Sequence, residues 1–209
     1  MIPVKVLAVR YLANASPALC EALGAPKGYP SLAILTTDCD DATYIALDAA
    51  TKAAEVEVAY GRSFYAGAAN ASTPNAGEVI GILAARTPGA VRSGMDAALS
   101  ALERLGFREV DGVPYLAHTV SSVGSFLAKE AGVRVGTALA YLIAPPLEGM
   151  YALDAALKAA DVRLCKLYAP PSETNFGGGL LAGTQSACDA ACAAFASAVA
   201  EVSGRQIEV

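Results

Sequence analysis

Short apolar runs and longer amphipathic stretches alternate along the whole chain. Runs of about four to eight apolar residues, bounded by glycine, proline or polar residues, are typical of strands, and helical spacing of apolar positions is typical of helices. Strands are predicted at residues 4–10, 31–37, 55–60, 78–84, 114–120, 138–144, 162–168 and 178–182. Helices are predicted at residues 15–23, 41–53, 88–105, 122–131, 149–160 and 185–202.

Capping residues support three of these helix starts. Asp40 or Asp41 precedes the second helix, Thr87 precedes the third with Pro88 at its first position, and Thr184 precedes the last. Strands mixed with helices at this spacing favour helices on one face of a mainly antiparallel sheet. The predicted fold class is α+β, with two tandem ferredoxin-like domains.

A repeated segment indicates the two domains. YIALDAATKAAEV at residues 44–56 returns as YALDAALKAADV at residues 151–162, with Asp48 matching Asp154. A domain of about 100 residues buries only about 60–70% of its unfolded surface, so packing on its twin or on other subunits is expected. The two domains are predicted to span residues 1–108 and 109–209.

Composition narrows the function classes. Hydrophobic residues make up 55% of the 209 residues and charged residues 17%, without an apolar run near the roughly 20 residues of a membrane helix. Subunit interfaces are therefore the expected place for the apolar surface. The N-terminal residues predict a strand rather than a signal or transit peptide, which favours a cytoplasmic protein. A net charge of −5 without a Lys or Arg cluster argues against nucleic acid.

Cysteine and histidine form no metal or redox motif in the sequence. Of five cysteines, only Cys188 and Cys192 are close, and the single histidine, His118, has no partner residues at a recognisable spacing. Small buried apolar residues are the preferred interpretation of the cysteines, and a core or hydrogen-bonded role is preferred for His118. Neither a metal nor another cofactor is expected.

Each copy of the repeat carries an acid and a lysine four residues apart. Asp48 with Lys52, and Asp154 with Lys158, have the favourable order for a helix, but such pairs add little stability and usually mark a solvated face. Each lysine lies among alanines, so a long cationic side chain projects from a flat surface. A neighbouring protein could approach closely there.

Several segments of the sequence resemble a known protein family. The D-x-x-x-K-A-A-x-V helix in both halves resembles the edge helix of bacterial microcompartment shell proteins. DCDDATYIALDAATKAAEVEVAYGRSFYAGAANAS and APPSETNFGGGLLAGTQSACDAACAAF resemble its tandem-domain, circularly permuted branch for ethanolamine utilisation. The resemblance implies a homotrimeric, pseudohexameric tile that contacts other shell proteins, with Lys52 and Lys158 at contacts between tiles.

The resemblance also implies small pores within the subunits that bind ethanolamine. The matching positions are Asp40, Glu78, Phe107, Thr174 and Phe176. Protonated ethanolamine needs an anion for its ammonium, a partner for its hydroxyl and an aromatic face, and this set offers all three. Without the resemblance, Asp40 reads as a helix cap, Phe107 as core and Thr174 as a turn residue.

The resemblance further implies a larger central opening that closes through loop movement, and the loop at residues 60–77 is the expected gate. Small residues there permit rearrangement of the backbone, and Arg62, Phe64 and Tyr65 are the candidate gate residues. A plain surface loop is the alternative interpretation.

Two other functions stay open from the residues alone. One is a soluble ferredoxin-like regulatory module that binds a small effector. The other is an enzyme that uses Asp38, Asp40 and Asp41 in acid–base or metal chemistry, although no nucleophile motif occurs in the sequence. We expect a structural shell protein and no enzyme.

Overall fold

The computed structural model of the chain describes residues 1–64, 75, 77–170, 172 and 174–205. Two compact units divide the chain between them. Unit 1 comprises Met1–Ile2, Gly106–Val123 and Ala128–Val209, and unit 2 comprises Pro3–Leu105 and Gly124–Leu127. Because two short segments are exchanged, the units are not simple halves of the chain. The boundary expected after residue 108 stays a prediction.

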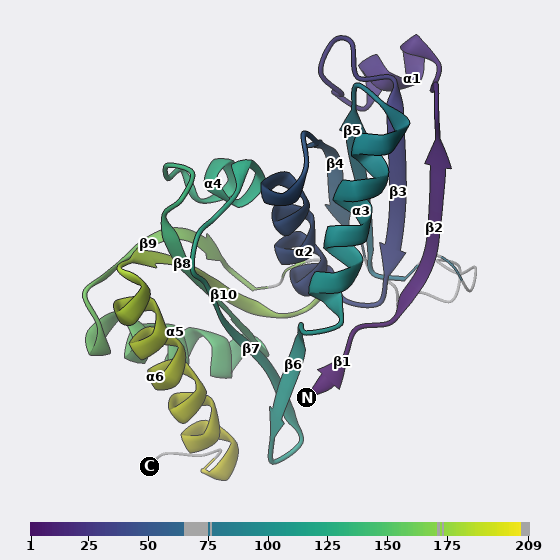
Figure 1. Ribbon diagram of the computed structural model, residues 1–209. Coiled ribbons are helices and arrows are strands. Elements are labelled where there is room, and N and C mark those ends of the chain that lie inside the picture. Colours follow the sequence, from purple (N-terminus) through teal and green to yellow (C-terminus); the bar gives the residue numbers. More distant parts are fainter. Residues whose placement is uncertain (65–74, 76, 171, 173, 206–209) are drawn as a thin grey trace. The chain divides into compact units, whose positions relative to one another are not determined.

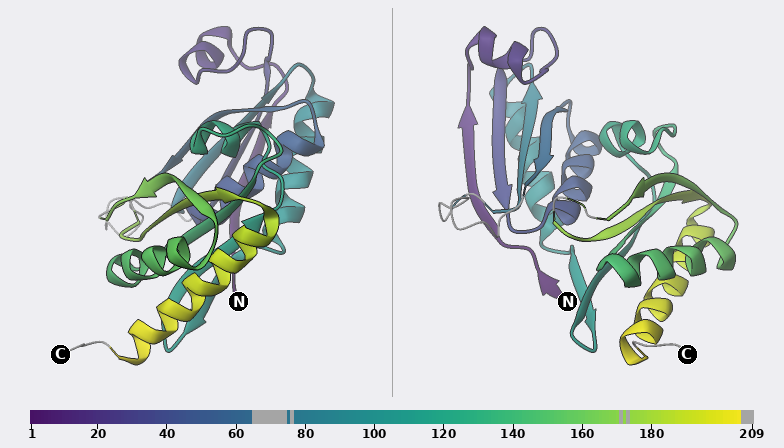
Figure 2. Two further views of the ribbon diagram at one scale, coloured as in Figure 1. Left: turned by 90° about the vertical axis from the view of Figure 1, so that its left-hand side faces the viewer. Right: turned by 180° about the vertical axis from the view of Figure 1, so that it is seen from behind.

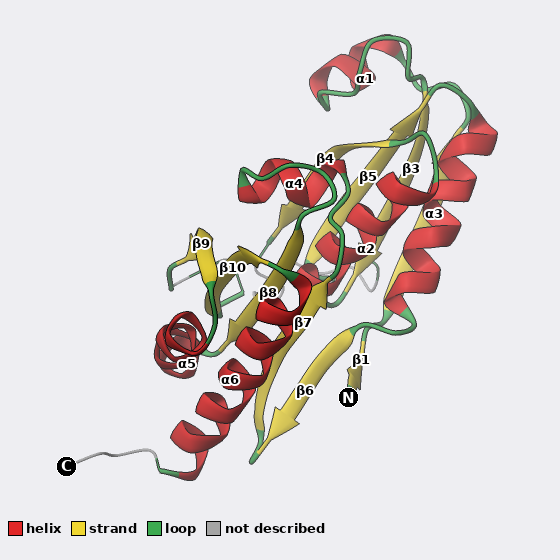
Figure 3. Cartoon of the chain, turned by 60° about the vertical axis from the view of Figure 1, so that its left-hand side comes forward, coloured by secondary structure: helices red, strands yellow, loops and turns green. Residues whose placement is uncertain are grey.

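Unit 2 is a four-stranded antiparallel sheet, and its two longer helices lie on one face of it (Figures 1 and 3). Its strand order is β2 (Val6–Leu12), β3 (Ser31–Thr37), β5 (Val79–Ala85) and β4 (Glu57–Ser63). The helices are α1 (Pro17–Ala22), α2 (Asp40–Ala53) and α3 (Pro88–Leu102). The last two pack against each other and against the central strands β3 and β5.

Apolar side chains from α2 and α3 form the core of unit 2 above the central strands. Leu35 of β3, Leu83 of β5, Leu47 of α2 and Met95 of α3 are fully buried. Gly81 lies directly beneath Leu47, where a Cβ would stand 2.7 Å from the Leu47 Cδ1 atom. The missing side chain lets α2 lie close to the sheet, and this closeness positions the first turn of α2 beside the start of β5.

Unit 1 is built around a six-stranded sheet with α5 and α6 on the same face (Figures 1 and 2). Its strand order is β1 (Ile2–Pro3), β6 (Gly106–Val110), β7 (Val113–Val120), β8 (Ala138–Ala144), β10 (Gly177–Gly183) and β9 (Val162–Tyr168). The helices are α4 (Ser125–Ala131), which begins in unit 2, α5 (Pro146–Ala159) and α6 (Gln185–Gly204). Phe195 of α6 and Leu153 of α5 pack with Leu142 and Leu181 in one core.

The predicted α+β class with two tandem units is confirmed, and β3, β8 and β9 have the predicted bounds. The sequence interpretation missed β6 and its hairpin with β7. Asp111 and Gly112 form the two-residue turn of that hairpin, both with positive φ, and Val110 pairs with Val113 across it. An Asp-Gly pair between alternating residues is a strong hairpin signal that the sequence already contained.

Capping of the helices followed the prediction at two of three starts. The Thr87 and Thr184 hydroxyls accept the N–H groups of Ala90 and Ala187, each at 3.2 Å. The prediction for the second helix was wrong, because Asp40 and Asp41 lie inside α2 and its N-cap is Cys39, without a side-chain cap. The two acids are therefore available for roles other than capping.

Helix α6 corrects one expectation about apolar length. Over its 20 residues α6 is apolar and long enough to cross a membrane by length and composition alone. A third of the relevant window is buried inside the structure. Since Cys188, Ala191, Phe195 and Val199 of α6 belong to the core of unit 1, its apolarity has a role in packing.

Candidate functional site

Three acidic side chains gather in unit 2 where α2 begins and β5 begins. Asp40 lies in the first turn of α2 and is only 8% exposed, and Glu78 directly precedes β5. The Glu78 N–H donates to the Thr37 carbonyl at 2.8 Å, which holds Glu78 beside the end of β3. Asp38, next to that strand end, accepts the Lys5 backbone N–H at 2.7 Å.

Gly77 allows this placement of Glu78. Its φ is +66°, and a Cβ at this position would stand 2.0 Å from the Thr37 carbonyl oxygen. A side chain is therefore excluded by both backbone conformation and space. The backbone at Gly77 fixes where the next residue, Glu78, enters the acidic group.

Burial and mutual repulsion raise the proton affinity of these acids. Burial, together with the charges of Asp40 and Asp38, raises the pKa of Glu78 to about 7. Burial also raises the pKa of Asp40, which hydrogen bonds from Ser63 and from the Asp41 N–H partly offset. A bound cation would relieve this repulsion, so the group is suited to an ammonium ion.

Tyr44 and Ser63 connect this acidic group to β4. The Tyr44 hydroxyl and the Ser63 hydroxyl lie 2.5 Å apart, and burial raises the pKa of Tyr44 to about 12. Sequence reasoning missed both residues. A tyrosine four residues after a buried acid on one helix was the signal available, because such residues share a face.

Two phenylalanines from the predicted set meet in unit 1. Phe107 on β6 and Phe176 before β10 have ring centroids 5.6 Å apart in an edge-to-face arrangement. The Ser172 hydroxyl accepts the Phe176 N–H, and the Ser172 carbonyl accepts the Asn175 N–H, which closes a turn that contains the half-buried Thr174. The five predicted ligand residues thus form two groups, one in each unit.

The predicted gate residues have separate positions along β4 and after it. Arg62 is exposed on β4 opposite Ile80, and Phe64 is half-buried, with its N–H donated to the Glu78 carbonyl at 2.9 Å. Tyr65 lies outside the described residues, and so does most of the predicted loop. Gating stays a prediction.

The two predicted tile-edge lysines have different surroundings. Lys52 is 36% exposed, and its Nζ lies 3.2 Å from Oδ2 of the fully buried Asp48. Lys158 is 75% exposed and pairs with Asp154, which is itself 63% exposed. The solvated face expected for both pairs is correct only for the second pair.

Asp48 has a structural role that the sequence interpretation missed. Its carboxylate accepts the N–H groups of Gly124 and Leu127 at 2.8 and 2.9 Å, at the start of α4. Thr51 adds a third bond there, because its hydroxyl accepts the Ser125 N–H. Asp48 therefore caps a helix that lies far from it in the sequence.

The cysteines agree partly with the sequence interpretation. Cys39 and Cys188 are buried, whereas Cys20, Cys165 and Cys192 are half-buried, and all five are free thiols. Among the residues that the structure describes, no three His, Cys, Asp or Glu side chains gather as a metal site. Burial raises the pKa of Cys39 far above its usual value, which makes its thiol unreactive.

Comparison with known proteins gives the class of this chain. Residues 31–113 match the BMC domain. The fold also superposes on the trimeric bacterial microcompartment shell protein PduB with a TM-score of 0.80, over 96% of this chain and 89% of that one, at 20% identity. The domain match and the superposition together show that the chain has the BMC-domain fold.

More similar relatives define the family within this class. The EutL shell protein of Clostridium perfringens is 56% identical over 99% of this chain and 97% of its own length. The crystal structure of the ethanolamine utilisation protein EutL from Leptotrichia buccalis is 56% identical, with a TM-score of 0.95 over 100% of this chain and 98% of that one. The chain belongs to the EutL family of bacterial microcompartment shell proteins. This family is structural rather than enzymatic, which decides against the regulatory-module and enzyme alternatives.

Proposed function

We propose that this shell protein assembles as a homotrimeric, pseudohexameric tile with other shell proteins and binds protonated ethanolamine through Asp40 and Glu78. The observation that supports binding of this cation is the acidic group of unit 2. Burial and two neighbouring acids raise the pKa of Glu78 to about 7, so an ammonium group bound there would lower the repulsion. The name of the EutL relative from Leptotrichia buccalis, an ethanolamine utilisation protein, supports ethanolamine as the cation.

Ligand size limits the affinity. Ethanolamine has four heavy atoms, and a ceiling of about 1.5 kcal/mol per atom gives at most about 6 kcal/mol, or tens of micromolar. We expect millimolar binding. Weak binding suits a pore, because a ligand that is held tightly would block transit.

Calorimetric titration with ethanolamine tests the proposal. Glu78→Gln and Asp40→Asn are each expected to weaken binding at least about tenfold, because each removes an anion from the ammonium. Glu148→Gln, which changes the first-turn acid of α5, is the matched control and should bind like the wild type. Propanol, which has no ammonium group, should not bind. Unchanged affinity in Glu78→Gln removes Glu78 from the site.

Phe107, Thr174 and Phe176 are proposed as further ligand residues on the family resemblance alone. Phe176→Leu is measured apart from the acid variants, with Thr174→Val as its polar counterpart. Weaker ethanolamine binding with an unchanged melting temperature supports a ligand role. Unchanged binding leaves the edge-to-face pair with Phe107 as a packing contact.

A gated central pore is the last part of the proposal, with Arg62, Phe64 and Tyr65 in the gate. The Phe64 N–H donates to the Glu78 carbonyl, so the segment after β4 is joined by its backbone to the acidic group. We expect two conformations of residues 60–77 across crystal forms. The same arrangement in every crystal form, with and without ethanolamine, would contradict gating.

A further inference from the structure

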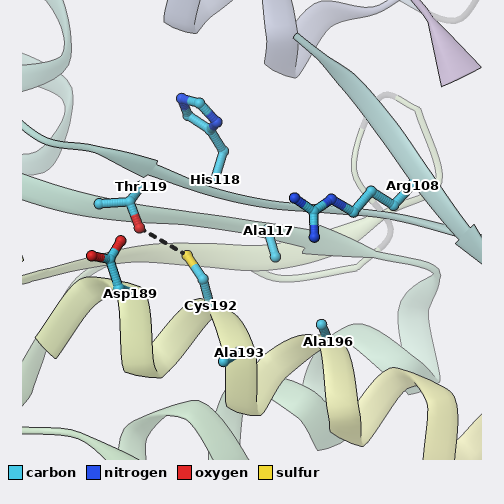
Figure 4. Close-up of a pocket in the computed structure, with 8 residues that line it drawn as sticks. All are labelled: Arg108, Ala117, His118, Thr119, Asp189, Cys192, Ala193 and Ala196. Carbon is cyan, nitrogen blue, oxygen red and sulfur yellow. Dashed lines mark hydrogen bonds between the residues drawn. The ribbon is translucent and has the colours of Figure 1, made fainter. Parts of the chain in front are cut away.

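A crevice in unit 1 lies between strand β7 and helix α6. Its volume is about 320 Å³. Three alanines make its walls: Ala117 on β7, and Ala193 and Ala196 on one face of α6 (Figure 4). Since these side chains are small, the helix and the sheet leave space for an aliphatic chain.

Polar groups stand at the end of the crevice near Thr119. The Thr119 hydroxyl lies 3.5 Å from the Cys192 sulfur, and Asp189 is on α6 nearby (Figure 4). Burial raises the pKa of Cys192 to about 11, so the thiol stays protonated and neutral. His118 also lines the crevice, but its ring points to the other side of β7 (Figure 4).

Opposite charges stand at the two ends. Arg108 on β6 extends over Ala117, whereas Asp189 lies near Thr119 (Figure 4). The charge of Asp189 raises the pKa of the Cys192 thiol, and the charge of Arg108 lowers it. Within the described part of the chain, Arg108 and Asp189 form an ion pair neither with each other nor with a third residue.

We propose that this crevice binds a small zwitterion, an aliphatic ω-amino acid. The guanidinium N–H groups of Arg108 would donate hydrogen bonds to the carboxylate. The Asp189 carboxylate and the Thr119 hydroxyl would accept hydrogen bonds from the ammonium. The methylene groups would lie over Ala117, Ala193 and Ala196. The volume is at the small end of ligand pockets, which fits a short chain. Ethanolamine lacks the carboxylate that Arg108 would bind, so it is not the ligand expected here.

Binding of an ω-amino acid series to the full-length assembled protein tests the proposal. Glycine, β-alanine, γ-aminobutyrate, 5-aminopentanoate and 6-aminohexanoate are titrated by calorimetry and saturation-transfer NMR. We expect millimolar affinity with an optimum at one chain length, because only one length spans both charges. Pentylamine and pentanoate, which each carry one charge, should bind at least about tenfold more weakly.

Variants locate the ligand. Arg108→Gln and Asp189→Asn should each weaken the best ω-amino acid about tenfold, and Ala196→Phe should abolish binding by filling the crevice. Glu109→Gln, the neighbour of Arg108 on β6, is the control and should bind normally. Should Ala196→Phe fail to fold, the two charge variants, with melting temperatures measured for each, decide the question.

Three outcomes would overturn the site. They are no saturable binding at about tens of millimolar, equal binding of the singly charged analogues, and unchanged affinity in either charge variant. Ethanolamine titrations of Arg108→Gln separate this inference from the proposed function. An unchanged ethanolamine affinity there, with a weakened ω-amino acid affinity, assigns the two ligands to different sites.

Discussion

Helices α2 and α5 are two copies of one sequence with different roles. Both carry an acid followed four residues later by a lysine, then alanines and a strand. In α2 the acid, Asp48, is fully buried and bonds to the start of α4. In α5 the acid, Asp154, is 63% exposed, and among the described residues it bonds only to Lys158.

The difference shows that the spacing of a repeat does not determine its energetics. The i, i+4 order fixes only that acid and lysine meet on one helix face. How much the acid stabilises the protein depends on a segment that is far away in the sequence. Here that segment is Gly124–Leu127, which packs on α2 and donates two N–H groups to Asp48. One copy of the repeat therefore contributes to stability, and the other carries an exposed pair.

Removing Asp48 should have the largest effect on stability. Asp48→Ala leaves the N–H groups of Gly124 and Leu127 without their acceptor, and we expect the free energy of unfolding to fall by about 3 kcal/mol. Urea unfolding at one fixed protein concentration measures it. Asp154→Ala is the matched variant and should unfold like the wild type. Equal losses in both variants would abolish the contrast between the copies.

The close approach of Gly124 to α2 gives the next effect. An added Cβ would stand 2.2 Å from the Thr51 hydroxyl oxygen and 2.8 Å from the Asp48 carbonyl oxygen. Gly124→Ala should therefore destabilise the chain by about 1–3 kcal/mol, because the backbone must shift. Gly89→Ala in the first turn of α3, where nothing lies within 4 Å, is the control. A Gly124→Ala protein as stable as wild type would mean that α4 does not pack on α2 as described.

The first copy has an acid cluster with raised pKa values near the start of its helix, so pH should affect its stability. Burial raises the pKa of Glu78 from 4.5 to about 7 in the folded state, which then binds the proton more tightly than the unfolded state. Stability from this group is complete below the unfolded pKa and is lost as pH rises through the folded pKa. After allowance for screening of a half-buried group, Glu78→Gln should be about 1 kcal/mol more stable than wild type above that range.

Melting temperatures measured across the same pH range check this prediction. The wild type should lose stability between the unfolded and folded pKa values, whereas Glu78→Gln should lose less. Parallel curves for the two proteins would contradict the raised pKa.

The sequence predicted the parts of the molecule that depend on local pattern. The bounds of β3, β8 and β9 and the caps Thr87 and Thr184 follow from short-range chemistry. The β6–β7 hairpin was within reach too, since its Asp-Gly turn is a local signal. The role of Asp48 could not be predicted in this way, because it depends on N–H groups more than 70 residues away in the chain.

The site residues, too, depend partly on contacts that a local sequence pattern does not indicate. The raised pKa of Glu78 depends on burial and on two acids from other segments, which no spacing in the sequence indicates. The position of Glu78 depends on the bond from its N–H to the Thr37 carbonyl and on the positive φ of Gly77, and only the glycine is visible in the sequence. The family resemblance supplied these residues before any packing was visible.

The smallest effect on stability is expected for the two lysines, and it tests their proposed role at tile edges. Lys52→Ala removes the cation beside buried Asp48, which keeps its two N–H donors, so the loss should stay below about 1 kcal/mol. Lys158→Ala should leave unfolding unchanged, because its pair with Asp154 is exposed. If both residues contact neighbouring tiles, both variants should form fewer two-dimensional sheets in electron micrographs. Lys158→Ala is the sharper variant, since a loss of sheets without a loss of stability can come only from a contact outside the subunit. Sheets of normal extent from Lys158→Ala would remove Lys158 from the tile edge.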